Sequence, residues 1–179
     1  MKRFLLSAAL AAMAFSISAQ TFDEWRNPQV NEVNRAPMHS SYFAYESFER
    51  AEEFAKSNSS NYLSLNGKWK FFWTKDSDTR PVNFQKPDFD DRNWAEMPVP
   101  GIWELNGYGD PTYVNVSYPW ENQFRNDPPN VPVENNHTGT YRRSFVVPDN
   151  WAGKDIIAHF GSVTSNIYLW VNGKFVGYS

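Results

Sequence analysis

Two short runs with strand character near the carboxyl end of the chain are separated only by Asn172 and Gly173. Residues 167–171 and 174–178 are both rich in aromatic and β-branched side chains, which favour strands. Both central residues of a type I′ turn need a positive φ, and Asn and Gly tolerate it better than other residues. The sequence therefore predicts a tight β-hairpin over residues 167–178.

Three further segments carry strand signals. Residues 68–73 alternate strictly, with three aromatic rings on one face and two lysines on the other, which is typical of a half-buried strand. Residues 141–147 repeat the alternation, although Arg143 shares the apolar face, and residues 156–160 form a short apolar run. Short strands joined by turns, without alternating helices, predict an all-β sandwich or jelly roll.

A long connection, residues 98–136, separates the early strands from the late ones and is rich in Pro, Gly and Asn. Such a length inside a compact domain is uncommon unless the connection is functional. The chain also reaches Ser179 straight out of the hairpin. A strand that ends in this way exposes backbone groups and apolar side chains, so we expect the β-sandwich to be incomplete at the carboxyl end.

The first 19 residues are typical of a secretory signal peptide. Lys2 and Arg3 precede an apolar run over residues 4–15, and residues 16–19 offer small side chains for cleavage. A buried amino-terminal helix is the alternative. The run is short for a bilayer, and no later segment approaches the roughly 20 apolar residues of a membrane span. We expect export to the periplasm or the extracellular space.

Residues 20–62 are predicted to form an irregular amino-terminal extension, interrupted by two prolines. The exception is residues 47–56, where apolar side chains recur at helical spacing behind Ser47, which suits an N-cap. A short helix is therefore expected here. The domain organisation is then a signal peptide over 1–19, the extension over 20–62 and a β domain over 63–179.

Charge, cysteine and histidine content argue against several classes of function. Loss of Lys2 and Arg3 with the signal takes the net charge from −3 to −5, which argues against nucleic-acid binding. The absence of cysteine removes disulfides and thiolate metal sites. His39, His137 and His159 show no ligand spacing, so we assign no metal here. We interpret His159, inside the expected strand over 156–160, as a structural side chain.

Five motifs occur in a fixed order from residue 65 to the end of the chain. They read L-N-G-K-W-K-F over 65–71, F-D-D-R-N-W over 89–94, V-P-G-I-W-E over 99–104, T-G-T-Y-R-R-S-F over 138–145 and L-W-V-N-G-K-F-V-G-Y-S over 169–179. Together they resemble the amino-terminal domain of glycoside hydrolase family 2, and the upstream runs 24–28 and 34–37 also match. The resemblance implies a galactose-binding-like jelly-roll β-sandwich over 63–179.

Residues 108–120 read Y-G-D-P-T-Y-V-N-V-S-Y-P-W and are similar to a loop of the β-galactosidase branch, as is the segment 128–135. The resemblance implies that this loop reaches into the galactose pocket of a neighbouring barrel, where Asn115 contacts the galactosyl group and Val116 forms a wall. An amide suits adjacent hydroxyls because it both donates and accepts. From the residues alone, Asn115 is explained more readily as a side chain that satisfies loop backbone. Tyr118 and Trp120 either frame the aglycone or pack internally.

We assign no catalytic residue to this chain. Retaining glycosidases need two carboxylates about 5–5.5 Å apart. The adjacent pairs Asp90–Asp91 and Glu52–Glu53 project apart, and nothing in the spacing of the loop carboxylates requires them to converge. The loop carboxylates that could converge are Glu104, Asp110 and Glu134. The resemblance places both catalytic glutamates on a barrel outside this chain, and the magnesium and sodium ligands of full-length relatives in later segments.

The resemblance thus implies the amino-terminal part of a retaining enzyme that hydrolyses terminal β-D-galactosides. Its partners are then the sugar and the remaining domains of the same enzyme, with a homo-oligomer possible for the full-length protein. Two alternatives stay open. The chain is a non-catalytic carbohydrate-binding module, since jelly rolls often bind sugars, or it belongs to a family 2 glycosidase of other sugar specificity.

Overall fold

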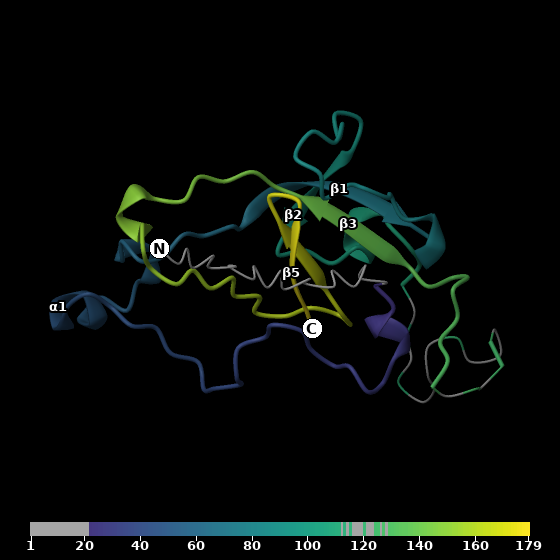
Figure 1. The fold of residues 1–179 in the computed structure, drawn as a ribbon, viewed down its shortest axis with the longest axis horizontal. Helices are drawn as coiled ribbons and strands as arrows, with labels where there is room; N and C mark the ends of the chain where they lie inside the picture. The colour runs from purple at the N-terminus through teal and green to yellow at the C-terminus, as the bar shows by residue number, and fades with distance from the viewer. Residues whose placement is uncertain are drawn as a thin grey trace, which may run out of the picture.

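In the computed structural model, the described residues form two open antiparallel sheets (Figure 1). The structure describes residues 22–111, 113, 115, 120, 124, 125, 127 and 129–179. One sheet has the order β2–β1–β3, and the other is the hairpin β4–β5. The strands are β1 (Gly67–Thr74), β2 (Ala95–Val99), β3 (Thr138–Arg142), β4 (Tyr168–Val171) and β5 (Lys174–Tyr178). The predicted all-β class is confirmed.

Short helical turns lie in the amino-terminal extension and between the strands. They are η1 (Glu24–Arg26), α1 (Phe48–Glu52), η2 (Lys56–Asn58), η3 (Ser77–Thr79), η4 (Glu104–Asn106) and η5 (Asp149–Trp151). Within the described part of the chain, none of these helices has the length and apolar character needed to cross a membrane. The predicted signal peptide, residues 1–19, lies outside the described residues.

Strand β1 is the centre of the three-stranded sheet, and its predicted alternation is confirmed. Trp69 and Phe71 lie on the inner face, where Phe71 is only 1% exposed. Across the pairing with β2, Trp69 lies opposite Met97, which is fully buried. On the outer face Lys68 forms an ion pair with Glu96 at 3.0 Å. The inner face of β1 thus carries the aromatic core, and the outer face combines charged side chains with Phe72, whose ring lies 5.5 Å from that of Trp94.

The core around Phe71 leaves no room for a side chain at Gly139 of β3. The rings of Tyr108 and Tyr141 lie 4.8 and 4.7 Å from the ring of Phe71, and that of Trp103 lies 6.2 Å away. A Cβ on Gly139 would lie 2.5 Å from Cζ2 of Trp103 and 2.8 Å from Cε2 of Phe71. The indole can therefore pack on the strand only because residue 139 is glycine.

We predict that Gly139→Ala lowers the free energy of unfolding by about 1–3 kcal/mol, the usual cost of overpacking a core. Urea unfolding of the 179-residue chain measures it. Gly161→Ala is the matched control, because no atom lies within 4 Å of a Cβ at that position. Equal unfolding midpoints for the two variants would contradict the packing described here.

The hairpin matches its prediction. Asn172 and Gly173 adopt φ values of 50° and 80°, and Val171 pairs with Lys174 across the turn. The register shifts between Leu169 and Trp170, so the hairpin carries a bulge. The turn lies beside residues 85–87, because a Cβ on Gly173 would be 3.3 Å from Cδ of Pro87. The hairpin is thereby held against the segment that follows η3.

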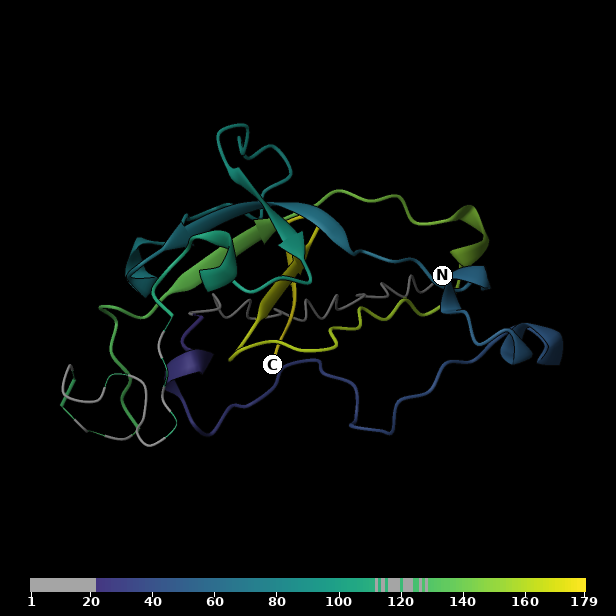
Figure 2. The ribbon, with the colours of Figure 1, turned by 180° about the vertical axis from the view of Figure 1, so that it is seen from behind.

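The amino-terminal extension covers the open end of the hairpin. Val33 and Tyr178 exchange two backbone hydrogen bonds of 2.8 and 3.0 Å, and Asn34 Nδ2 donates to the carbonyl of Val176. Tyr178 is consequently buried. The expectation that β5 ends with unpaired backbone is therefore wrong at Tyr178. In Figures 1 and 2 the extension passes beneath the end of the hairpin.

Tyr168 joins the extension to β4. Its hydroxyl accepts the N–H of Trp25 at 3.1 Å and lies 3.0 Å from Oε2 of Glu24. Burial, more than the neighbouring carboxylate, raises the pKa of Tyr168. The ring of Phe22 packs edge-on against that of Tyr168 at 5.8 Å. The predicted extension is thus irregular in backbone but specifically docked.

Two predicted strands are wrong. The strand expected over 141–147 lies instead at Thr138–Arg142. Arg143 does share the face of Tyr141, but its guanidinium turns to the carbonyls of Leu65 and Asn66. The residues after it leave the sheet. The strand expected over 156–160 is absent, and its apolar side chains are exposed. Within the described residues no neighbouring strand pairs with that run, so its apolar pattern produces no ladder.

The predicted helix is shorter than residues 47–56. Helix α1 ends at Glu52, and Phe54 has a φ of 51°, which a helix cannot contain. The predicted N-cap is confirmed, since Ser47 Oγ accepts the N–H of Arg50 at 3.3 Å. The expected apolar face is not buried, because Phe48 and Phe54 are 73% and 90% exposed. Although apolar residues recur here at helical spacing, the two phenylalanines among them do not pack in the core.

Candidate functional site

The loop expected to reach a sugar starts from the core. Gly107 has a φ of 85°, and this left-handed residue reverses the chain after η4. The next residue, Tyr108, donates its N–H to the carbonyl of Trp103 at 3.1 Å and places its ring against Phe71. The first residue of the loop is therefore fixed by the most buried ring of the sheet.

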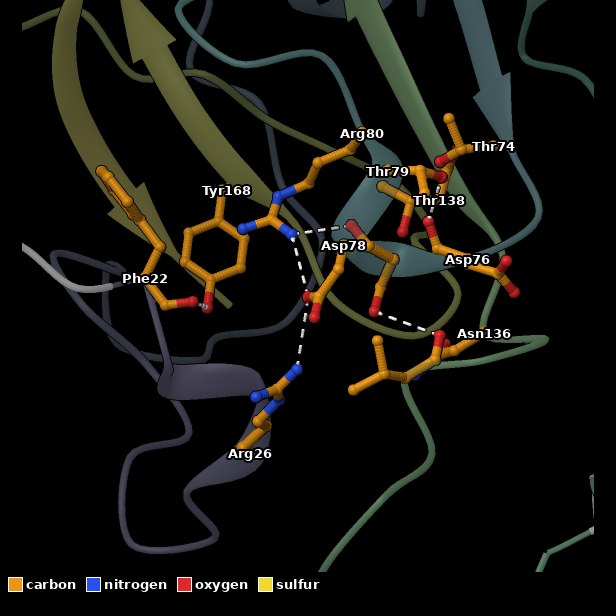
Figure 3. A network of polar contacts seen from close by, with 12 residues as sticks. Phe22, Arg26, Thr74, Asp76, Asp78, Thr79, Arg80, Asn136, Thr138 and Tyr168 are labelled. Atoms are coloured by element: carbon orange, nitrogen blue, oxygen red, sulfur yellow. Dashed lines mark hydrogen bonds and ion pairs between the residues drawn. The ribbon is translucent and has the colours of Figure 1, made fainter.

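The segment that returns from the loop to β3, residues 133–136, is held by the turn that follows β1. Ser77 of η3 is buried and donates its N–H to the carbonyl of Val133 at 3.2 Å. Oδ1 of Asp76 accepts the N–H of Asn135 at 2.6 Å. Figure 3 shows Asp76 beside the returning segment that carries Asn136. Both ends of the loop are thus anchored to the three-stranded sheet.

The predicted sugar contact lies on the exposed part of this loop. Asn115 is exposed, and Tyr113, two positions earlier, is 84% exposed. Val116, the other predicted contact, lies outside the described residues, as does Tyr118. An exposed amide can offer hydrogen bonds to hydroxyls, and an exposed aromatic ring can offer an apolar face to a pyranose ring.

Trp120 forms its hydrogen bond within the long connection and not toward solvent. Its Nε1 donates to the carbonyl of Asn135 at 2.9 Å, and the side chain is half-buried. Of the two roles considered for this residue, internal packing is therefore the one that the hydrogen bond supports. Trp120, the last residue of the 108–120 loop, is thereby bonded to the segment that Asp76 holds.

The adjacent acidic residues do not form a catalytic pair. Asp90 binds the guanidinium of Arg92 at 2.7 Å, and Asp91 binds Arg142 at 2.9 Å. The hydrogen bonds from Arg92 lower the pKa of Asp90, so that carboxylate is a poor proton donor near neutral pH. Two carboxylates committed to different arginines cannot share the work of an acid and a nucleophile.

The remaining acidic residues considered from the sequence are engaged elsewhere or exposed. Glu53 contacts Arg50 and accepts from Asn58 Nδ2, far from the loop in sequence. The three carboxylates of the connection that were considered from the sequence are exposed; they are Glu104, Asp110 and Glu134. Throughout the described residues there is no group of three or more His, Cys, Asp or Glu side chains that could hold a metal ion. No described residue is therefore given a role toward magnesium or sodium.

The histidines have separate surroundings. His137 packs its ring against Trp73 at 4.9 Å, next to Gly109. His39 is exposed and stacks near Tyr42. His159 is exposed and lies in no strand, so the prediction that it is a structural side chain of a strand is wrong. Within the described residues, no neighbouring strand pairs with the run 156–160 that contains it.

Two surface hollows are lined by described residues. A cavity of about 400 Å³ lies where the extension meets the end of the hairpin, with Glu24, Arg35 and Tyr178 among its lining residues. A second, of about 190 Å³, is lined by Lys70, Arg142 and their neighbours. Asn115 is not among the lining residues of either hollow.

Reasoning from the sequence missed the anchoring residues Asp76 and Ser77. The only local signal is the run D-S-D-T at residues 76–79, whose side chains favour turns because they bond nearby backbone groups. That pattern predicts a turn after β1. It does not reveal that Asp76 bonds Asn135, which lies 59 residues later in the chain.

Comparisons with known proteins identify the family of this chain. The family model described as "Glycosyl hydrolases family 2, sugar binding domain" matches residues 62–179. A β-galactosidase of Priestia megaterium is 36% identical over 166 residues, which cover 92% of this chain. The β-galactosidases of Halalkalibacterium halodurans and Lactobacillus delbrueckii subsp. bulgaricus are each 40% identical, over 86% and 85% of this chain. The chain spans 16%, 15% and 15% of the length of these relatives.

Proposed function

Because the chain belongs to glycosyl hydrolase family 2 through its sugar binding domain, we propose that it is the amino-terminal part of a longer β-galactosidase. That enzyme hydrolyses terminal non-reducing β-D-galactosides with retention. In it, this chain supports the catalytic barrel and contributes one loop to the galactose pocket. The similar relatives named β-galactosidase support the activity, and each is much longer than this chain.

The observation that carries the proposal is the anchored loop with exposed Asn115 and Tyr113. A contributed loop must be fixed at its base and free at its tip, because a ligand group held out of place loses binding free energy. Tyr108 fixes one end on the core, and Asp76 fixes the other. Asn115 is then available to bond galactosyl hydroxyls, with Val116 as a wall of the pocket.

The chemistry is divided between this chain and the rest of the enzyme. The acid/base and nucleophile carboxylates come from the barrel, and the loop orients the sugar against them. We further propose that the magnesium and sodium ions of such enzymes bind outside this chain, and that the full-length protein can form a homo-oligomer. Residues 1–19 direct export to the periplasm or beyond, as their tripartite pattern suggests.

The test compares two proteins from the same gene, the 179-residue chain and the product of the whole reading frame. We expect the longer protein to hydrolyse a chromogenic β-galactoside and to release β-galactose first, as followed by proton NMR. The 179-residue chain should give only the background rate, because the proposal places both catalytic carboxylates on the barrel.

Three outcomes would count against the proposal. Turnover by the pure 179-residue chain would show that the division of chemistry is wrong. A longer protein that hydrolyses β-glucuronides or β-mannosides but not β-galactosides would indicate another family 2 specificity. A reading frame without a barrel, together with galactose binding by the chain alone, would indicate a carbohydrate-binding module.

A further inference from the structure

We infer that Asp76 is a positioning residue for the galactose pocket, acting through Asn135 and Trp120 on the loop that carries Asn115. The inference rests on the proposed function of that loop. It concerns the turn at residues 76–79, which lies outside that loop and is not proposed to touch the sugar.

The first link joins Asp76 to Asn135. The carboxylate accepts the backbone N–H of Asn135 at 2.6 Å, and hydrogen bonds to a charged acceptor are the stronger kind. Asn135 has a φ of 54°, in the left-handed region, which Asn adopts more readily than other residues apart from glycine. The hydrogen bond from its N–H to Asp76 favours this conformation over the others that are open to Asn in a loop.

The second link joins Asn135 to Trp120. The carbonyl of Asn135 accepts the indole N–H at 2.9 Å, so one residue takes the Asp76 contact through its N–H and the Trp120 contact through its carbonyl. A rotation of the backbone at Asn135 moves both groups together. Trp120 is five positions after Asn115, a stretch that reaches about 18 Å at most. Displacement of Trp120 therefore changes where Asn115 can be.

The turn itself is well held, so it can serve as a fixed point. The hydroxyl of Thr79 donates to the carbonyl of Asp76 at 2.8 Å, and buried Ser77 bonds Val133. Asp78 faces the other way and pairs with Arg26 of the extension at 3.3 Å (Figure 3). Asp76 and Asp78 are thus two carboxylates on one turn, and among the described residues Asp76 contacts the loop segment whereas Asp78 contacts the extension.

This difference provides a matched control. In the full-length enzyme, Asp76→Ala is compared with Asp76→Asn, which keeps an acceptor oxygen, and with Asp78→Ala, which leaves the loop contacts intact. Hydrogen exchange measured by mass spectrometry follows the peptide that contains Asn135. Steady-state kinetics on a chromogenic β-galactoside separates KM from kcat.

For Asp76→Ala we expect faster exchange in the peptide containing Asn135 and a KM raised about tenfold, with kcat changed less than about twofold. Asp76→Asn should restore most of the KM, and Asp78→Ala should leave both readouts at the original values. Trp120→Phe, which removes the indole N–H but keeps an aromatic ring, should raise KM in the same direction. A purely structural loss would lower the amount of active enzyme without this selective change in KM.

The outcomes separate the two proposals. If Asn115→Ala raises KM but Asp76→Ala and Trp120→Phe do not, the positioning role of Asp76 is wrong and the proposed function stands. Unchanged exchange at Asn135 in Asp76→Ala also overturns the positioning role. If Asn115→Ala itself leaves the kinetics unchanged, the proposed function of the loop is wrong, and the role of Asp76 falls with it.

Discussion

Phe71→Ala is expected to lower the free energy of unfolding by about 3–5 kcal/mol, the usual cost of removing a large ring from a packed core. Phe71 is 1% exposed and lies at the centre of the aromatic cluster on the inner face of β1. Its ring also supports Tyr108, from which the loop departs. The same substitution should therefore loosen the first anchor of the loop.

Urea unfolding followed by tryptophan fluorescence measures this effect. Phe54→Ala is the matched control, because it removes the same atoms from a side chain that is 90% exposed. We expect that variant to unfold within about 0.5 kcal/mol of the original protein. A Phe71→Ala variant as stable as Phe54→Ala would show that the cluster around Phe71 is not the core.

The strands that the sequence predicts well are those whose pattern and partner are both local. The hairpin needs only Asn172, Gly173 and their flanking runs, so a short window contains its whole explanation. Strand β1 is recognisable because one face is aromatic and the other charged. Strand β2 has no such pattern, and it contains Pro98. A proline is acceptable there because β2 is an edge strand of the described sheet.

Apolar runs are poor predictors of strands and buried helix faces when the segments that pack beside them are unknown. Residues 156–160 are apolar enough for a strand, yet a strand exists only when another segment offers backbone partners. In the described structure Ile157 is 76% exposed. Similarly, α1 is correctly capped by Ser47 but buries no apolar face. Local chemistry predicts where a helix begins, whereas burial depends on the rest of the fold.

The loop could be located from the sequence, but its support could not. Its length and its resemblance to a β-galactosidase loop identify Asn115 as a candidate. The hydrogen bond between Asp76 and Asn135 joins two segments that only the fold brings together. No spacing rule predicts such a contact, because loop backbone follows no period. The structure therefore adds the anchor, while the proposed sugar contact remains an inference from resemblance and exposure.

Asn115→Ala in the full-length enzyme is expected to lower kcat/KM for a β-galactoside about hundredfold, or about 2.7 kcal/mol of transition-state stabilisation. A lost amide leaves sugar hydroxyls without their partner in a site from which water has been displaced, which makes the loss larger than for an exposed hydrogen bond. The fold should be unaffected, because Asn115 is exposed. The expected effect is thus kinetic, with little change in stability.

Asn130→Ala is a suitable control, since Asn130 is exposed and bonds Asp127 within the same loop. The most direct test of the central claim is therefore the ratio of kcat/KM for the original enzyme to that of Asn115→Ala, measured beside Asn130→Ala. The account predicts a ratio near 100 for Asn115→Ala and near 1 for the control. Equal kcat/KM values for the original enzyme and Asn115→Ala would contradict the claim that this chain contributes a sugar-binding loop.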